Sequence, residues 1–282
     1  MIKSSWLLFL LFFSASELFC QTELKVMSYN IRYDAPNDGE NLWDIRKSKL
    51  ASLMAYYDAD FIGTQEVKQH QLEFLLQHLS SYSYAGVART DGKKAGEYSA
   101  IFYNKEKYKL IEQSTFWLSL TPTIPSKNWD AAIERICTYG LFQHVASKKF
   151  VWILNTHFDH IGKESRFRAA GMIIDKIREL KKKKNCPVVF MGDLNATPEE
   201  NTIELLNQHL RDARLVSKLP AYGPESTWNA FEFTKKPDGR IDYVFVEDND
   251  RTRVLRFITI DDFYDFKYPS DHLPVMAHIQ IK

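Results

Sequence analysis

Apolar runs of strand length alternate with helical apolar patterns along most of the chain. Short apolar runs bounded by turn residues are typical of buried strands. They cover residues 24–29, 61–64, 100–103, 108–118, 136–145, 150–154, 187–190, 241–246, 254–260 and 275–281. Apolar side chains at helical spacing predict helices around residues 50–57, 72–79 and 167–177. We therefore expect one mixed α/β domain over residues 21–282, with a two-sheet sandwich as its simplest architecture.

Two local patterns refine this expectation. The consecutive β segments between residues 99 and 158 favour antiparallel pairing. Thr197-Pro198-Glu199-Glu200 has the form of a capping box with proline at the first helical position. We therefore expect a helix to start directly after the turn that contains Asp193 and Asn195.

The first twenty residues have the pattern of a signal peptide. Lys3 is followed by an apolar run over residues 6–13, too short to span a bilayer, and by the small residues 14–16. Residues 1–20 are thus predicted to be removed, and the protein is predicted to be exported, either to a periplasm or outside the cell. A lipid anchor on Cys20 is the alternative, which the bulky Phe19 disfavours.

Composition and charge give no indication of a strongly charged partner. The chain has 282 residues, 45% of them hydrophobic, and 37 Lys and Arg against 36 Asp and Glu leave a net charge of +1. No overall field therefore attracts nucleic acid or a membrane, and any preference for phosphate must be local. Cys137 and Cys186 sit beside strand-like runs, where buried free thiols are favoured over a single disulfide.

Polar side chains follow several of the predicted strands. Asn30, Glu66, His157 and Asp193 lie at or just past the ends of apolar runs, whereas Asp271 and His272 come just before one. If the last strand is antiparallel to its neighbours, all six side chains meet on one rim. Carboxylates there suit a hard divalent cation, and the acid, amide and histidine groups suit attack of water on a phosphoester.

The ordered motifs resemble those of the endonuclease/exonuclease/phosphatase superfamily. They are Ser28-Tyr29-Asn30-Ile31-Arg32, Gln65-Glu66, Gly96-Glu97-Tyr98, Asn155-Thr156-His157, Gly192-Asp193-Leu194-Asn195, Arg240-Ile241-Asp242-Tyr243 and Ser270-Asp271-His272-Leu273-Pro274. Several ordered motifs make the resemblance specific, although each alone is weak. The resemblance implies a four-layer α/β sandwich, with two mixed β-sheets flanked by helices.

The resemblance also implies roles for individual residues. Glu66 would be the principal Mg²⁺ ligand, with Asn30 and Asp271 near the metal and Mn²⁺ as a possible substitute. The remaining catalytic roles would belong to Asp193 (water activation), Asn195 (phosphate binding), His272 paired with Asp242, His157 paired with Glu97, and, more loosely, Arg135 (phosphate contact). Some relatives have an acid where this chain has Arg32, which makes a second metal ion there doubtful.

These observations predict an exported, metal-dependent phosphoesterase. The substrate stays open between nucleic acid, a nucleotide, a phosphoinositide and a phospholipid headgroup, so both a nuclease-like phosphodiesterase and a phosphatase remain. The alternative is a catalytically silent module of the same fold that binds a phosphate ligand. No protein partner is implied, and we expect a monomer. Asp159 and His160 either extend the site or form an ordinary exposed loop, and Trp129 and Trp228 are candidates for substrate contact.

Overall fold

Two six-stranded sheets form the centre of the protein. The structure is a computed structural model that describes residues 22–282, so the predicted signal peptide and Cys20 lie outside the described residues. The first sheet has the order β11-β12-β1-β2-β4-β3 and the second β5-β6-β7-β8-β10-β9. The strands of the first sheet are β1 (Thr22–Asn30), β2 (Phe61–Gln65), β3 (Tyr82–Ala85), β4 (Ile101–Asn104), β11 (Thr252–Thr259) and β12 (Val275–Ile281).

The second sheet is built largely from the middle of the chain. Its strands are β5 (Tyr108–Trp117), β6 (Ile136–His144), β7 (Phe150–His157), β8 (Val188–Asp193), β9 (Leu210–Asp212) and β10 (Asp242–Glu247). Strands β5, β6 and β7 pair antiparallel, as predicted, while β7 and β8 are parallel, as are β1 and β2 in the first sheet. Both sheets are therefore mixed. Strand β12 runs antiparallel to β1, which is the condition for the predicted rim.

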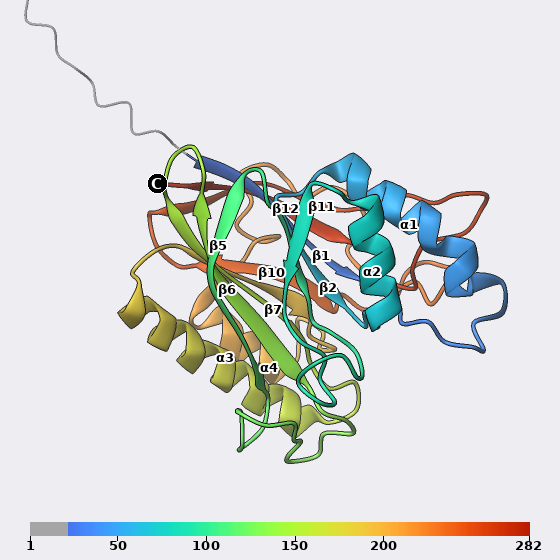
Figure 1. Ribbon diagram of the computed structural model, residues 1–282, viewed down its shortest axis with the longest axis horizontal. Coiled ribbons are helices and arrows are strands. Elements are labelled where there is room, and N and C mark those ends of the chain that lie inside the picture. Colours follow the sequence, from blue (N-terminus) through green and yellow to red (C-terminus); the bar gives the residue numbers. More distant parts are fainter. Residues whose placement is uncertain (1–21) are drawn as a thin grey trace, which may run out of the picture.

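Helices cover the outer faces of the two sheets. They are α1 (Trp43–Tyr57), α2 (Gln69–His78), α3 (Lys163–Lys183) and α4 (Asn201–Asn207), with a short 3₁₀ helix η1 (Gly39–Asn41) before α1. Figure 1 shows α1 and α2 on one side of the molecule and α3 and α4 on the other. Three apolar clusters fill the spaces between α1/α2 and the first sheet, between the sheets, and between the second sheet and α3/α4. The predicted four-layer sandwich is confirmed.

The alternation of side chains along the strands directs the polar rim residues between the two sheets. Successive residues of a strand point to opposite faces. In β1, Leu24 and Val26 belong to the inter-sheet cluster, and Asn30 shares their face. In β8, Val189 and Met191 belong to the same cluster, and Asp193 shares their face. The same relation holds in β7 for His157 and in β10 for Asp242. Four polar residues thus continue the inner apolar faces to the end of the sandwich.

The prediction for the segment after Asn195 is wrong in one respect. Residues 197–200 form a turn, in which the Glu200 amide donates to the Thr197 carbonyl oxygen at 3.0 Å, and helix α4 begins only at Asn201. The Glu200 carboxylate accepts from the Thr197 amide at 3.2 Å, so half of the capping box forms. The backbone of this turn is not helical, so helix α4 begins only after it.

Smaller features also differ from the sequence-based expectation. Strands β3 and β9 were not predicted, since they contain only four and three residues. Phe167, predicted to share a helix face with Ala170 and Ile174, lies at the exposed edge of α3, while the other two are buried. Cys137 and Cys186 are both free and buried, in agreement with the preference for free thiols.

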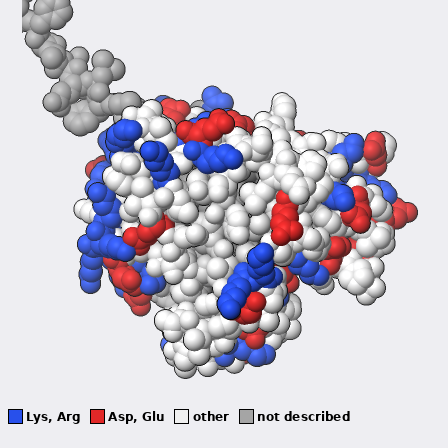
Figure 2. Space-filling model, in the orientation of Figure 1, with Lys and Arg blue, Asp and Glu red and all other residues white. Residues whose placement is uncertain are grey.

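The described surface is mixed in charge. In the view of Figure 2, Lys and Arg lie among Asp and Glu, and wide areas between them carry neither. This distribution matches the near-equal counts of basic and acidic residues. Within residues 22–282, no helix has the length and apolar character needed to cross a bilayer.

Candidate active site

The ten predicted site residues, six of them the predicted rim residues, gather around one cavity of about 620 Å³. Eight of the ten line it: Glu66, Glu97, Arg135, His157, Asp193, Asn195, Asp271 and His272. Asn30 and Asp242 lie directly behind, where each makes a hydrogen bond to one of these residues. The structure therefore brings together side chains from both sheets that are separated by up to 242 positions in the sequence.

Asp193 is the hub of this arrangement. Its carboxylate is buried and accepts from the Asn30 side chain at 2.9 Å and from the backbone amide of Asn195 at 3.0 Å. The Nε2 atoms of His157 and His272 lie 3.3 and 3.8 Å from its Oδ2 atom. Burial, followed by repulsion from Asp242, raises the pKa of Asp193 to about 7, against attraction to His272 and the hydrogen bond from Asn30. A carboxylate with such a pKa is suited to exchange a proton near neutrality.

The backbone around Asp193 requires a glycine before it. A Cβ atom on Gly192 would lie 2.2 Å from the carbonyl oxygen of Thr156 on the neighbouring strand β7. Asn195, two residues after the acid, has a left-handed φ of 46°. Asparagine tolerates this conformation better than most residues, and Asp193 stabilises it by accepting from the Asn195 amide. The Gly-Asp-Leu-Asn turn thus fixes the carboxylate at the end of β8.

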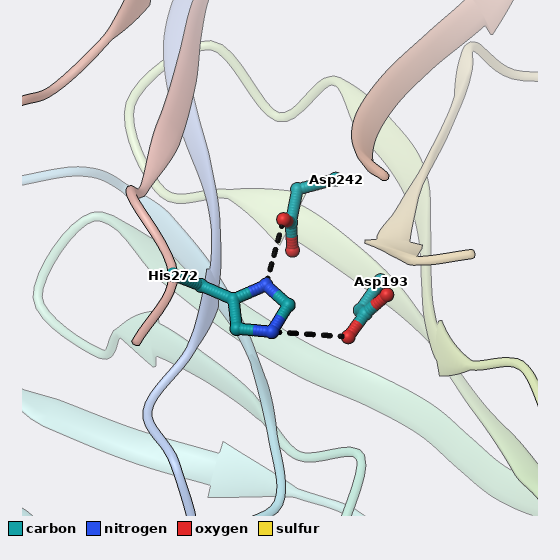
Figure 3. Close-up of side chains that lie close together, drawn as sticks. All are labelled: Asp193, Asp242 and His272. Carbon is teal, nitrogen blue, oxygen red and sulfur yellow. Dashed lines mark hydrogen bonds and ion pairs between the residues drawn. The ribbon is translucent and has the colours of Figure 1, made fainter. Parts of the chain in front are cut away.

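His272 bridges two buried acids, as Figure 3 shows. Its Nδ1 atom lies 2.9 Å from Asp242 Oδ2, and its Nε2 atom faces Asp193. Burial alone lowers the pKa of His272, but Asp242 and Asp193 together raise it well above its ordinary value. The imidazole therefore carries a proton between two carboxylates. The expected pairing of His272 with Asp242 is present in the structure.

Asp193, Asp242 and His272, the side chains drawn in Figure 3, are one candidate for a metal site. One ligand atom from each of Asp193, Asp242 and His272 lies within 4.8 Å of the others, and all three residues are buried. A hydrogen bond already occupies the Nδ1 atom of the histidine and one Asp242 oxygen. Mg²⁺ prefers oxygen ligands and retains several waters. The more open carboxylates nearby fit that preference better.

Glu66 and Asp271 are those carboxylates. Both line the cavity and are half-buried, and Glu66 has a left-handed φ of 63°. Burial raises the pKa of Asp271, His272 opposes this rise, and repulsion from Glu66 adds to it. Two acids that repel each other within a cavity are stabilised by a shared cation. The donor set therefore fits a divalent ion that takes oxygen ligands.

Asn30 has a different role from the one expected of a metal ligand. Its amide nitrogen donates to Glu66 Oε1 at 3.0 Å and to Asp193 Oδ2 at 2.9 Å, so it links the two acids. Its oxygen accepts from the Arg32 amide at 3.0 Å and is not presented to the cavity. The reason is that an amide group between two carboxylates must direct its hydrogens to both of them. Asn30 orients acids near the metal site.

The expected pairing of His157 with Glu97 is wrong. The carboxylate of Glu97 forms an ion pair with Arg89 at 2.8 Å instead, because that guanidinium lies in the same loop region and offsets the burial of the acid. His157 Nε2 lies 3.0 Å from the side-chain nitrogen of Asn195, and its buried Nδ1 has no hydrogen-bond partner. Burial, followed by Arg135 and Arg89, lowers the pKa of His157 well below its ordinary value. His157 is therefore neutral and lies beside Asp193.

Asn195 is also engaged differently from the prediction. The nitrogen of its side-chain amide donates to His157 Nε2 and to the carbonyl oxygen of Phe158, both at 3.0 Å. Both of its amide hydrogens are thus used within the protein. Donation of that amide to a phosphoryl oxygen would first require one of these hydrogen bonds to break.

Basic residues line the cavity near the acids. Arg32 forms a bidentate ion pair with Asp38, and its Nε atom lies 3.8 Å from Asp271 Oδ2, so a fixed positive charge stands beside the acids. Arg135 is buried, and its Nε and Nη1 atoms have no hydrogen-bond partner. Arg89 was not predicted, since it lies in a polar loop with no strand end or motif to mark it. Of the two tryptophans suggested for substrate contact, Trp228, 41% exposed, lines the cavity, and Trp129 does not.

A two-sheet sandwich with buried acids, amides and histidines on one rim defines a class of phosphoester-hydrolysing proteins. The Endonuclease/Exonuclease/phosphatase family model matches residues 27–272. The chain therefore belongs to the endonuclease/exonuclease/phosphatase family, whose members are hydrolases of phosphoester bonds and depend on metal ions.

Individual relatives differ in their named activities. A family protein from Bacteroides thetaiotaomicron is 35% identical with a TM-score of 0.89, covering 93% of this chain and 96% of that one. A mannosyl-6-phosphatase from the same organism is also 35% identical, with a TM-score of 0.87 and coverage of 91% and 99%. The Ccr4 3′-5′-exoribonuclease subunit of Mycosarcoma maydis is 24% identical over 93% of this chain, which spans only 51% of that relative.

Proposed function

We propose that the chain is an exported, magnesium-dependent phosphatase that removes a terminal phosphate from a phosphorylated sugar. The observation that carries the proposal is the buried Asp193 carboxylate, surrounded by Asn30, His157 and His272 and open to the same cavity as Glu66. Acid-base groups, a cation site and phosphate-binding donors are the three needs of phosphoester hydrolysis, and this cavity supplies residues for each.

Asp193 would accept the proton of the attacking water. Burial and the Asp242 charge raise its pKa to about 7, so the carboxylate is basic enough to accept a proton near neutral pH. Asn30 holds the orientation of this carboxylate through its 2.9 Å hydrogen bond. His157, which is neutral, occupies the other side of the Asp193 oxygen at 3.3 Å.

His272 would stabilise charge on the phosphoryl group. Its Nδ1 atom is fixed by Asp242 at 2.9 Å, which leaves the Nε2 proton on the side of Asp193 and the cavity. A protonated imidazole there stabilises negative charge as it develops on phosphoryl oxygens. Arg32 and Arg135 add two further positive charges to the cavity wall.

Glu66 and Asp271 would hold the divalent cation, with Mn²⁺ as a possible substitute for Mg²⁺. Bound there, the cation would neutralise charge on the non-bridging phosphate oxygens. Asn30 donates to the Glu66 oxygen Oε1, and the Tyr33 amide donates to Oε2 at 3.0 Å. These hydrogen bonds fix the orientation of the Glu66 carboxylate, as hydrogen-bond partners commonly do for metal ligands.

Three observations favour a sugar phosphate as the substrate. The relative named as a mannosyl-6-phosphatase is 35% identical and is covered over 99% of its length, whereas the Ccr4 relative is 24% identical and covered over about half. A cavity of about 620 Å³ has the size of a small-molecule site. The chain has a net charge of only +1, and the face drawn in Figure 2 mixes Lys and Arg with Asp and Glu, which favours a small phosphoester over a polynucleotide.

Export rests on the sequence alone. The basic start, the apolar run over residues 6–13 and the small residues that follow support a signal peptide over residues 1–20. Expression of the full chain followed by N-terminal sequencing of the exported protein would test this part separately. A mature N-terminus near Gln21 supports export, and an intact Met1 in the cell interior contradicts it.

A substrate panel tests the proposed reaction. Protein beginning at Gln21 would be incubated with Mg²⁺ and mannose 6-phosphate, glucose 6-phosphate, bis(p-nitrophenyl) phosphate or an adenine oligoribonucleotide. A His272→Asn variant, prepared in the same way, controls for contaminating phosphatases. Release of phosphate from the sugar monoesters by the wild type alone is expected. Cleavage of only the diester or the oligonucleotide would favour a nuclease, and no turnover at all would favour a silent binding module.

A further inference from the structure

His160 lies on the cavity wall in a loop that is held rigidly from beneath. It follows β7 and is exposed, and it lines the same cavity as Asp193. The preceding Asp159 is buried, and its carboxylate accepts from the backbone amides of residues 132, 133, 161 and 162 at 2.8–3.4 Å. The position of the His160 backbone is therefore fixed by its neighbour.

Arg135 fixes the hydrogen position on the His160 ring. Its Nη2 atom lies 3.0 Å from His160 Nδ1, and its Nε atom lies 3.6 Å from Asp159 Oδ2. A guanidinium can only donate, so Nδ1 must accept, and the ring hydrogen must reside on Nε2. Arg135 is 5% exposed, which limits its freedom to swing away. Among residues 22–282, no protein group makes a hydrogen bond to the Nε2 atom of His160.

The surrounding charges maintain this neutral form. Burial lowers the pKa of His160, and Arg135 and Arg89 lower it further, while Asp159 and Glu66 oppose them. Protonation would also place a hydrogen on Nδ1 directly against the guanidinium of Arg135. His160 therefore offers the cavity one fixed N–H donor.

A phosphate in the cavity needs such a donor. Both amide hydrogens of Asn195 are used by His157 and Phe158, so the residue expected to bind phosphate has none to spare. The Nε and Nη1 donors of Arg135, on the same wall as His160, make no hydrogen bond within the protein. We propose that His160 donates its Nε2 hydrogen to a non-bridging oxygen of the substrate phosphate, with Arg135 as the residue that sets its tautomer. This proposal rests on the proposed phosphatase function.

Side-chain NMR tests the tautomer without any need for turnover. A long-range ¹H–¹⁵N spectrum of the histidine rings at pH 7.5 would be recorded for the wild type and for a His160→Ala variant, whose missing signals identify His160. A protonated Nε2 with an unprotonated Nδ1 is expected. A protonated Nδ1 would overturn the proposal, because Arg135 could not then donate to it.

Binding of inorganic phosphate tests the contact itself. Calorimetry in the presence of Mg²⁺ would compare the wild type with His160→Ala, His160→Gln and His209→Ala, the last being an exposed histidine outside the cavity. Loss of one hydrogen bond to a charged group predicts a Kd about tenfold higher for His160→Ala. Glutamine, whose oxygen can accept from Arg135 while its nitrogen donates, should restore most of the affinity, and His209→Ala should match the wild type.

Other outcomes of the binding experiment would contradict the proposal. An unchanged Kd in His160→Ala, an equal loss in His160→Gln, or no phosphate binding by the wild type would each overturn it. The substrate panel fails separately from these measurements, since a protein without phosphatase turnover can still show the tautomer and the phosphate contact. The two proposals are thus distinguishable.

Discussion

The Asp242→Asn substitution removes a charge from the buried network while it preserves the shape of the side chain. The Asp242 carboxylate is 1% exposed and accepts from His272 Nδ1 at 2.9 Å. The oxygen of an asparagine amide can still accept this hydrogen bond. The substitution therefore tests the charge on Asp242 and leaves the position of the imidazole nearly unchanged.

The magnitude follows from two opposing effects of that charge. A hydrogen bond to a charged group contributes about 1.5–3 kcal/mol, against about 0.5–1.5 kcal/mol for a neutral one, so its weakening costs roughly 1–2 kcal/mol. Asp242 also raises the pKa of Asp193 by repulsion, and relief of this repulsion offsets part of that cost. We therefore expect a loss of less than about 2 kcal/mol in unfolding free energy, and a fall in kcat/KM of about 10²–10⁴-fold.

The stability cost should also depend on pH. The folded pKa of His272 lies above its unfolded value, so its stabilisation is present below about pH 6.5 and is lost as the pH rises through the folded pKa. Asparagine at position 242 lowers that folded pKa. The difference in unfolding free energy between wild type and variant should therefore be larger at about pH 6 than at about pH 9.

Urea unfolding in EDTA at these two pH values, together with initial rates of phosphate release in Mg²⁺, would measure both effects. Asp261→Asn, at an exposed position, serves as the matched control and should change neither quantity. The reasoning is refuted if Asp242→Asn retains wild-type kcat/KM, or if the variant is more destabilised at pH 9 than at pH 6.

Three further predictions address the metal, the backbone and the thiols. Glu66→Gln should raise the Kd for Mn²⁺, measured by calorimetry, by about tenfold or more through loss of a ligand charge. Unchanged Mn²⁺ affinity would contradict this, and the exposed Glu106→Gln is the control. Gly192→Ala should destabilise the fold by more than about 2 kcal/mol in urea, since its Cβ would clash with a β7 carbonyl oxygen; wild-type stability would show that the strands can separate. Burial raises the pKa of the Cys137 thiol, and raises that of Cys186 to about 11, so neither should react with Ellman's reagent at pH 8 before unfolding. Rapid labelling of the native protein would disprove their burial.

The sequence was most informative where a polar residue ends an apolar run. Asp193 and His272 could be placed on one rim from two facts. Side chains alternate between the two faces of a strand, and β12 runs antiparallel to β1, so the residues just before β12 lie at the end of the sandwich where β1 ends. The same argument covers Asn30 and His157. The fold class follows from the alternation of strand-length apolar runs with helical patterns, since strands buried on both faces need layers on both sides.

Hydrogen-bond partners were less predictable than positions. Glu97 was expected to pair with His157, but it forms an ion pair with Arg89 from the same loop. Nothing in the local sequence predicts that ion pair. The direction of the Asn30 amide depends on Glu66 and Asp193, which are far from it in the sequence. Such choices are decided by the relative energies of competing donors in three dimensions, and motif spacing contains no information on them.

The proposed reaction requires both Asp193 and a divalent cation for hydrolysis of a phosphoester in this cavity. The most direct test is the initial rate of phosphate release from the best substrate of the panel, measured for the wild type and Asp193→Asn in Mg²⁺ and again in EDTA. Rapid release is expected only from the wild type in Mg²⁺, with release by the folded variant at least about 100-fold slower and none in EDTA. A wild-type rate that persists in EDTA, or an Asp193→Asn rate equal to that of the wild type, would contradict it.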